Sequence, residues 1–134
     1  MNHKRTVSAV SGLALLCAGI VAAAPAEASH GGGADAIRNS GQCAHGGGTW
    51  KLKAKPDDAG LEIEFEVDTN QIGQLWHVRI TDNGNVVADR NVRTTAPSGS
   101  FSVQSRTANR AGVTDTIRAH AFRGDRVCGG QVQV

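Results

Sequence analysis

Apolar and polar side chains alternate with a period of two from residue 50 onward, and this pattern limits the fold more than any other feature. Residues 50–55 alternate tryptophan, leucine and alanine with three lysines, and residues 61–67 alternate four apolar residues with three glutamates. Successive side chains of a β-strand point to opposite faces, so this alternation is typical of strands that bury one face. Turn formers at residues 56–60 predict a hairpin between the two strands.

One antiparallel register of this hairpin suits both of its faces. Placing Lys51 opposite Glu66 aligns each of the three lysines with a glutamate, and it places Trp50 opposite Val67. A shift by one residue would exchange the faces, so the pattern fixes the register. The acidic residues could instead form a Ca²⁺ site around Asp57, but their alignment with lysines favours a structural role.

The same period continues through the rest of the chain. Residues 75–81 place Trp76 on an apolar face, and Asn83-Gly84 predicts a two-residue turn after them. The register of that hairpin would place Asp89 on the apolar face, so we expect a β-bulge or a change of sheet near this residue. A short strand at residues 101–103 follows.

The last hairpin turns at Gly124-Asp125, which pairs Ala121 with Cys128. Small residues around Cys128 leave space for a bulky neighbour, either Trp50 or Trp76. About seven short strands in total predict an all-β fold, an antiparallel β-sandwich, with a small barrel as the alternative.

A sandwich that closes on Trp76 in its third strand resembles immunoglobulin and fibronectin type III modules, so the expected fold is Ig-like. The chain departs from that pattern because it has no tyrosine for a tyrosine corner. Residues 50–58, 61–68, 73–76 and 96–101, together with Cys128, also resemble small secreted actinobacterial proteins of unassigned function. This resemblance implies export and a single β domain, and it supplies no catalytic residues.

The first 28 residues are typical of a secretory signal peptide, with a basic start, an apolar stretch and a small-x-small cleavage pattern ending at Ala28. The alternative is an uncleaved membrane anchor. Residues 29–48 contain two runs of three glycines and predict a flexible leader, because glycine is costly to order. The sequence therefore predicts three parts: a signal peptide (1–28), a Gly/His-rich leader (29–48) and an Ig-like domain (49–134).

Two cysteines, Cys43 and Cys128, remain after removal of the signal peptide, which carries Cys17. Two cysteines in an exported chain indicate one disulfide bond. We therefore expect a secreted, extracellular protein that no longer contacts the membrane once the signal peptide is cleaved.

The formal net charge of +2 argues against specific nucleic-acid binding, which needs a basic stripe. No nucleophile-and-base signature is present, so we expect neither catalytic residues nor a cofactor. The leading hypothesis is a non-catalytic binding or structural module for an extracellular protein or an anionic cell-wall polymer. Its candidate contact surface combines aromatic and arginine residues, as interfaces do, and consists of Arg118, Phe122, Arg123, Arg126 and Val127.

Two other functions remain open at the level of the sequence. The histidines next to glycine runs, His30 and His45, could bind Cu²⁺ or Ni²⁺ through imidazole and backbone nitrogens. His77 and His120 lie on outward faces of strands that are neighbours in an Ig-like sandwich, where their rings could approach each other as a weaker metal site. The third hypothesis is an inhibitor of a secreted hydrolase that presents a rigid loop.

Overall fold

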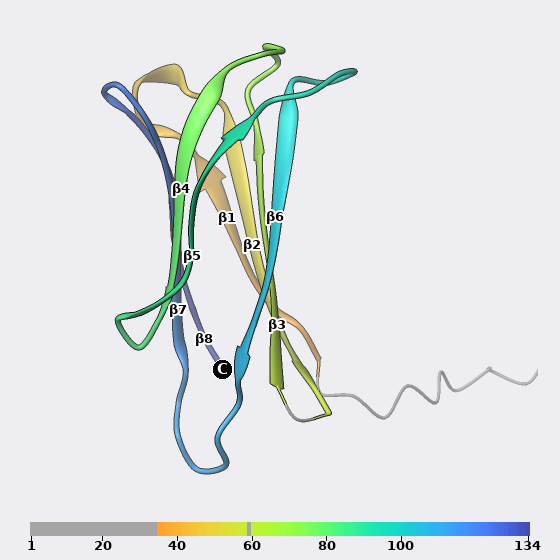
Figure 1. Cartoon of the computed structure of the whole chain (residues 1–134), viewed down its shortest axis with the longest axis vertical. Coiled ribbons are helices and arrows are strands. Elements are labelled where there is room, and N and C mark those ends of the chain that lie inside the picture. The colour runs from red at the N-terminus through yellow and green to blue at the C-terminus, as the bar shows by residue number, and fades with distance from the viewer. Residues whose placement is uncertain (1–34, 59) are drawn as a thin grey trace, which may run out of the picture. The chain divides into compact units, whose positions relative to one another are not determined.

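The computed structural model describes residues 35–58 and 60–134. The predicted signal peptide, its cleavage site, the first part of the leader and His30 lie outside the described residues. The described chain is all-β, with eight strands in two antiparallel sheets of four strands that face each other as a sandwich (Figure 1). No helix within it is long and apolar enough to cross a membrane.

The first sheet has the strand order β1-β2-β3-β6, and the second has the order β5-β4-β7-β8. The strands of the first sheet are β1 (Ile37–Gln42), β2 (Thr49–Asp57), β3 (Gly60–Asp68) and β6 (Ser100–Ala108). The strands of the second sheet are β4 (Leu75–Asp82), β5 (Asn85–Arg93), β7 (Thr116–Arg123) and β8 (Arg126–Gln133). In Figure 1 the second sheet stands on the left and β2, β3 and β6 stand on the right.

The two hairpins predicted in detail are both confirmed. In β2 and β3, Lys51 lies opposite Glu66 and Leu52 lies opposite Phe65. In β7 and β8, Ala121 lies opposite Cys128, and the two strands turn between Arg123 and Arg126. In each hairpin the alternating pattern and the turn residues specify the same register.

The predicted β-bulge lies in the β4–β5 hairpin. Ile80 lies opposite Ala88 but Thr81 lies opposite Val86, so Val87 is the extra residue. The extra residue shifts the later part of β5 by one position, so that its inward and outward side chains are exchanged. As a result Asp89 lies opposite Arg79 on the outer face instead of entering the core.

The core lies between the sheets and is built from the inward positions of six strands, with partly buried side chains of β5 packed against it. Trp50 packs over Gly130, because a Cβ atom built on Gly130 would lie 2.5 Å from the edge of the indole ring. The space expected near Cys128 is therefore taken by Trp50 at Gly130, while Trp76 is fully buried and reaches Gly47 beside Cys43. The largest fully buried side chains are Trp76, Phe65, Leu52, Leu61, Ile63, Ile80 and Ile117.

The prediction of a flexible leader is wrong from residue 37 onward, and the strand count is eight instead of about seven. Ile37–Gln42 forms β1, which pairs with β2 along its whole length, and Ala44–Gly46 forms a single 3₁₀ turn. The side chains of β1 are mostly exposed, so the strand is held by backbone hydrogen bonds, which leave no alternating signal in the sequence. The Asn39 amide also donates to the Gln131 carbonyl of β8, 3.0 Å away, which links the two sheets at this edge.

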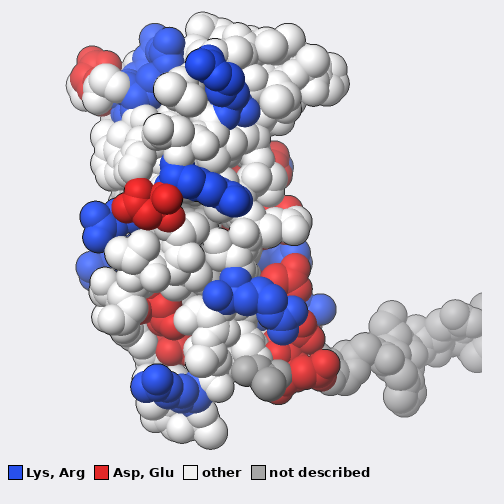
Figure 2. Space-filling view, viewed as in Figure 1, with Lys and Arg blue, Asp and Glu red and all other residues white. Residues whose placement is uncertain are grey.

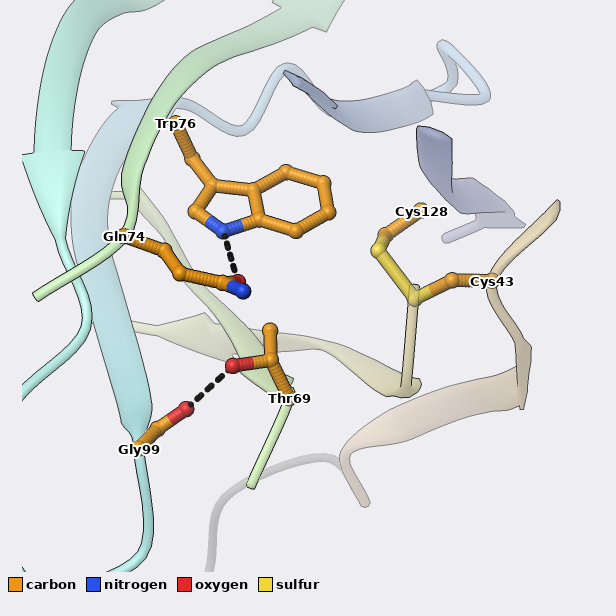
Figure 3. The surroundings of a disulfide bond; sticks show 6 residues. All are labelled: Cys43, Thr69, Gln74, Trp76, Gly99 and Cys128. Atoms are coloured by element: carbon orange, nitrogen blue, oxygen red, sulfur yellow. Dashed lines mark hydrogen bonds between the residues drawn. A yellow bond between two sulfur atoms is a disulfide. The ribbon is translucent and has the colours of Figure 1, made fainter. Parts of the chain in front are cut away.

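The predicted disulfide is confirmed and joins Cys43 to Cys128 (Figure 3). Cys43 follows β1 and Cys128 lies in β8, so the bond fastens the first sheet to the second. Beside it, the Trp76 indole N–H donates to the Gln74 side-chain oxygen at 3.2 Å, which satisfies the one polar atom of this buried ring (Figure 3).

Candidate functional site

The outer face of the second sheet carries the predicted contact residues that the fold brings together. Strand alternation sends side chains of β4, β7 and β8 outward on this face, over a sheet whose other face is the core. We call this the second-sheet surface, and it consists of Leu75, His77, Arg79, Arg118, His120, Phe122 and Val127.

The centre of the second-sheet surface is apolar. Phe122 lies opposite Val127 on β8 and opposite His77 on β4, and Leu75 lies two residues before His77. Phe122 is 40% exposed and Leu75 is 47% exposed. Because large apolar side chains are usually covered, three of them from three adjacent strands form a small patch that a partner could bury.

His120 extends this apolar centre. Its ring stacks on the Phe122 ring, with the centroids 6.0 Å apart. Burial lowers the pKa of the His120 imidazole, and the positive charge of Arg118 lowers this pKa further. The imidazole is therefore neutral at neutral pH and presents a flat, uncharged surface beside the phenyl ring.

Arginines and one carboxylate border the patch. Arg118 donates through Nε to the Gln131 side chain at 3.0 Å, which holds the guanidinium against β8. On the other side an Asp89 carboxylate oxygen lies 3.1 Å from His77 Nε2, and the other lies 4.0 Å from Arg79 Nε. These exposed contacts contribute little stability, but they fix the positions of the polar groups around the patch.

The other predicted contact residues, Arg123 and Arg126, lie elsewhere. They pair with each other at the tip of the hairpin and, by alternation, occupy the side opposite to Phe122 and Val127. The Cβ atom of Arg126 lies 3.3 Å from the position that a Cβ on Gly47 would take, next to the 3₁₀ turn. Arg118, Phe122 and Val127 therefore share the outer face of the second sheet. Arg123 and Arg126 lie at the β7–β8 turn, on the other side of the hairpin.

The histidines proposed as metal ligands do not form a metal site. As expected, His77 and His120 lie on neighbouring strands, at diagonal positions of β4 and β7, but both ring nitrogens of His77 contact Asn91 and Asp89 on β5. His45 is exposed in the 3₁₀ turn. Among residues 35–58 and 60–134, no group of three or more histidine, cysteine, aspartate or glutamate side chains could hold a metal ion.

The outer face of the first sheet is covered by paired charges. Lys53 lies 3.0 Å from Glu64 and Lys51 lies 3.8 Å from Glu66, around a shallow hollow of about 270 Å³ next to β1. Asp57, considered above for a Ca²⁺ site, instead pairs with Arg106 at 2.8 Å. On the side of the molecule drawn in Figure 2, lysines and arginines stand in separate groups with acidic side chains between them, and they form no continuous basic stripe.

One pair of acidic residues was missed by the sequence reasoning. Asp82 and Asp115 are both buried at the end of the sandwich where β4 turns into β5 and where β7 begins. They border a hollow of about 340 Å³ together with Thr107 and Arg110. The signal was present in the alternation, since both aspartates occupy inward positions that otherwise carry apolar residues.

The chain was compared with protein-family models, with curated proteins and with solved structures, and none of them matches it. The functional interpretation below therefore depends on the geometry of these surfaces.

Proposed function

We propose that this chain is a secreted, non-catalytic binding module that contacts an extracellular protein through the second-sheet surface. The observation that carries the proposal is the exposed Phe122, which lies between Val127 and His77. Leu75 and Arg79 occupy the diagonal positions on β4, and Arg118 lies four residues before Phe122 on the same face of β7. Aromatic residues and arginine are enriched in protein interfaces and supply most of the residues that dominate binding energy. A rigid sheet presents them without an ordering cost on binding.

Export is supported by two independent features. The first 28 residues have the composition of a signal peptide. The Cys43–Cys128 disulfide belongs to a class of bonds that persists in oxidising compartments outside the cytosol. Together they support an extracellular place of action.

We also propose that the sandwich is Ig-like. Strands β4, β7 and β8 occupy the places of strands C, F and G of an immunoglobulin domain, and β2, β3 and β6 occupy those of A, B and E. In this assignment β1 is an additional edge strand that pairs with strand A, and β5 is an edge strand that pairs with strand C. In this assignment the second-sheet surface is the outer face of the C-F-G sheet.

A protein partner fits the second-sheet surface better than an anionic polymer. A polymer would use Arg79 and Arg118, but Asp89 next to Arg79 reduces the local positive charge. The apolar side chains of Leu75, Phe122 and Val127 gain free energy only when a partner covers them, which a folded protein does more completely than a hydrated polymer.

The test is co-sedimentation of the purified exported chain with cell walls of the producing organism. Protease treatment of the walls removes protein partners, and acid extraction removes anionic polymers. We expect binding that is lost after protease treatment and that weakens at least about tenfold in Phe122→Ser, the loss typical of a central interface residue. Arg118→Ser, at the border of the patch, should weaken binding by a smaller factor.

Two variants serve as matched controls because they remove the same kind of side chain elsewhere. Ile37→Ser removes an apolar side chain that is 42% exposed on β1 of the first sheet, and Lys55→Ser removes a positive charge from the same sheet. Both should bind like the original chain. Binding that survives protease treatment but not acid extraction would make the wall polymer the partner, and unchanged binding by Phe122→Ser would exclude this surface.

A further inference from the structure

Two buried carboxylates stand where the fold expects apolar side chains. Trp76, Val78 and Ile80 point from β4 into the core, and Asp82 is the next inward position. Asp115 lies two residues before Ile117, which is the first core residue of β7. A departure from the core pattern at two neighbouring positions is expected at functional sites more than elsewhere.

Neighbouring residues donate hydrogen bonds to only two of the four carboxylate oxygens of Asp82 and Asp115. The Thr107 hydroxyl, from the opposite sheet, donates to Asp82 Oδ2 at 2.9 Å, and the Asn83 amide donates to Asp115 Oδ1 at 3.2 Å. Asp82 Oδ1 and Asp115 Oδ2 are buried and have no hydrogen-bond partner among the described residues. A buried, unpaired carboxylate oxygen is costly, so each of these atoms needs a hydrogen-bond donor or a cation beside it.

The two aspartates also act on each other. Asp82 lies opposite Ile117 in the sheet, so Asp115 is its diagonal neighbour. Burial raises the pKa of the Asp115 carboxyl, and the negative charge of Asp82 raises it further. Two influences lower this pKa: the positive charge of Arg110, an exposed residue at the edge of the hollow, and the hydrogen bond that the Asn83 amide donates to Asp115.

We propose that Asp82 and Asp115 bind a divalent cation, Ca²⁺ in preference to others, through their free carboxylate oxygens. All candidate donors here are oxygens, which Ca²⁺ prefers, and no histidine or cysteine borders the hollow. The hollow, about 340 Å³, has room for several waters to complete the coordination shell. The loop residues 109–113 on its outer side are exposed, which gives the ion a route in from solvent.

The surrounding residues hold the carboxylates in place. The Asn83 side-chain oxygen accepts from the Thr116 N–H at 3.0 Å, and its amide donates to the Thr114 carbonyl as well as to Asp115. Asn83 therefore joins the β4–β5 turn to the start of β7. Bound Ca²⁺ would draw three segments together, because Thr107 brings in β6.

Two carboxylates alone give weak binding, in the range of about 0.1–1 mM that is typical of extracellular modules. Isothermal titration with CaCl₂ alone should show saturable binding in this range. With a Kd of about 0.5 mM, about 10 mM CaCl₂ should favour the folded state by about 20-fold over an NaCl control of equal ionic strength. Amide NMR signals of residues 82–83 and 114–116 should shift during the titration.

Isosteric variants locate the site. Asp82→Asn and Asp115→Asn should each abolish the Ca²⁺ effect, whereas Asp125→Asn removes an equal charge at the opposite end of β7 and should leave it intact. Arg110→Ser removes the opposing charge and should tighten binding about threefold.

Three results would overturn the proposal. A Ca²⁺ effect that persists in both Asp82→Asn and Asp115→Asn would place the ion elsewhere, as would NMR shifts confined to other residues of the original chain. The third result is the absence of any Ca²⁺ effect up to about 20 mM together with a higher stability of Asp115→Asn. It would mean that Asp82 and Asp115 share a proton, which offsets their repulsion, and that they bind no cation.

Discussion

Gly129 has surroundings that exclude every side chain. Its φ angle is 147°, and a Cβ atom at this position would lie 2.0 Å from the Ala119 carbonyl oxygen. The missing side chain lets β8 approach β7 closely beneath His120, which lies opposite Gly129. The second-sheet surface therefore depends on this residue for its shape.

We expect Gly129→Ala to lower the free energy of unfolding by about 3 kcal/mol or more, because a steric clash adds to the strain of a positive φ. Gly84→Ala provides the matched control, since Gly84 also has a positive φ, 86°, but no atom lies within 4 Å of the added Cβ. It should lose only about 1 kcal/mol. Urea denaturation measures both, and equal losses would show that β8 does not approach β7 in this way.

The proton affinity of Asp115 makes the stability of the metal-free protein depend on pH. Because its pKa is raised in the folded state, the folded protein holds this proton more tightly than the unfolded chain does. The resulting stabilisation is complete below the unfolded pKa and is lost as the pH rises through the folded pKa.

With EDTA present, Asp115→Asn should therefore gain stability relative to the original chain as the pH rises from about 4 to about 8. Thermal unfolding at several pH values measures the difference between the two proteins, which removes the contribution of other titrating groups. Asp125→Asn should follow the original chain throughout. A constant difference for Asp115→Asn would show that this carboxyl has the same pKa in both states.

At the scale of the strands, the sequence alone allows the hairpins to be predicted because two independent signals agree there. In β2 and β3 the charge pattern and the apolar pattern specify one register, and in β7 and β8 the turn at Gly124-Asp125 does so. The bulge could be predicted from Asp89, since a carboxylate in the core would be too costly.

β1 could not be predicted because its stabilisation comes from backbone pairing at the edge of β2, which any sequence without proline can supply. The contact surface could be predicted only in part. Alternation identifies Phe122 and Val127 as outward, but the contribution of Leu75 and His77 depends on β4 pairing with β7, a contact between segments far apart in the sequence. The role of Asp82 beside Asp115 depends on the same pairing.

The charge pairs of the first hairpin can be tested by reversal. Lys53 and Glu64 lie 3.0 Å apart, with each side chain about 30% exposed. We expect Lys53→Glu to destabilise the protein by about 1 kcal/mol through repulsion, and Lys53→Glu combined with Glu64→Lys to restore most of the loss. Urea denaturation of the original chain, of Lys53→Glu and Glu64→Lys alone, and of the double variant gives the coupling energy. A double variant as unstable as the sum of the single ones would contradict the pairing.

At the scale of the whole molecule, the disulfide restrains nearly the entire domain. Cys43 and Cys128 are separated by 85 positions, so the bond closes a loop that contains every strand except β1 and the end of β8. Closing a loop of this length in the unfolded chain is worth about 4.5 kcal/mol in the chain-entropy model. This is comparable to the total stability of a small domain.

Replacing both cysteines by serine should therefore lower the free energy of unfolding by about 3–5 kcal/mol. Urea denaturation with and without a reducing agent checks this value. The reducing agent should destabilise the original chain by a similar amount and leave the double serine variant unchanged. If complete reduction left the free energy of unfolding of the original chain unchanged, the disulfide would not stabilise the protein by restricting the unfolded chain.

The second-sheet surface is the central claim, and amide NMR mapping of the exported chain with its protease-sensitive wall partner tests it most directly. The signals of β4 and β7 around His77, Arg79, Arg118 and Phe122, and that of Val127 on β8, should shift or broaden when the partner is added. Signals of the lysine and glutamate face of β2 and β3 should stay in place. Perturbation of that face of the first sheet, with β4 and β7 unchanged, would contradict the claim.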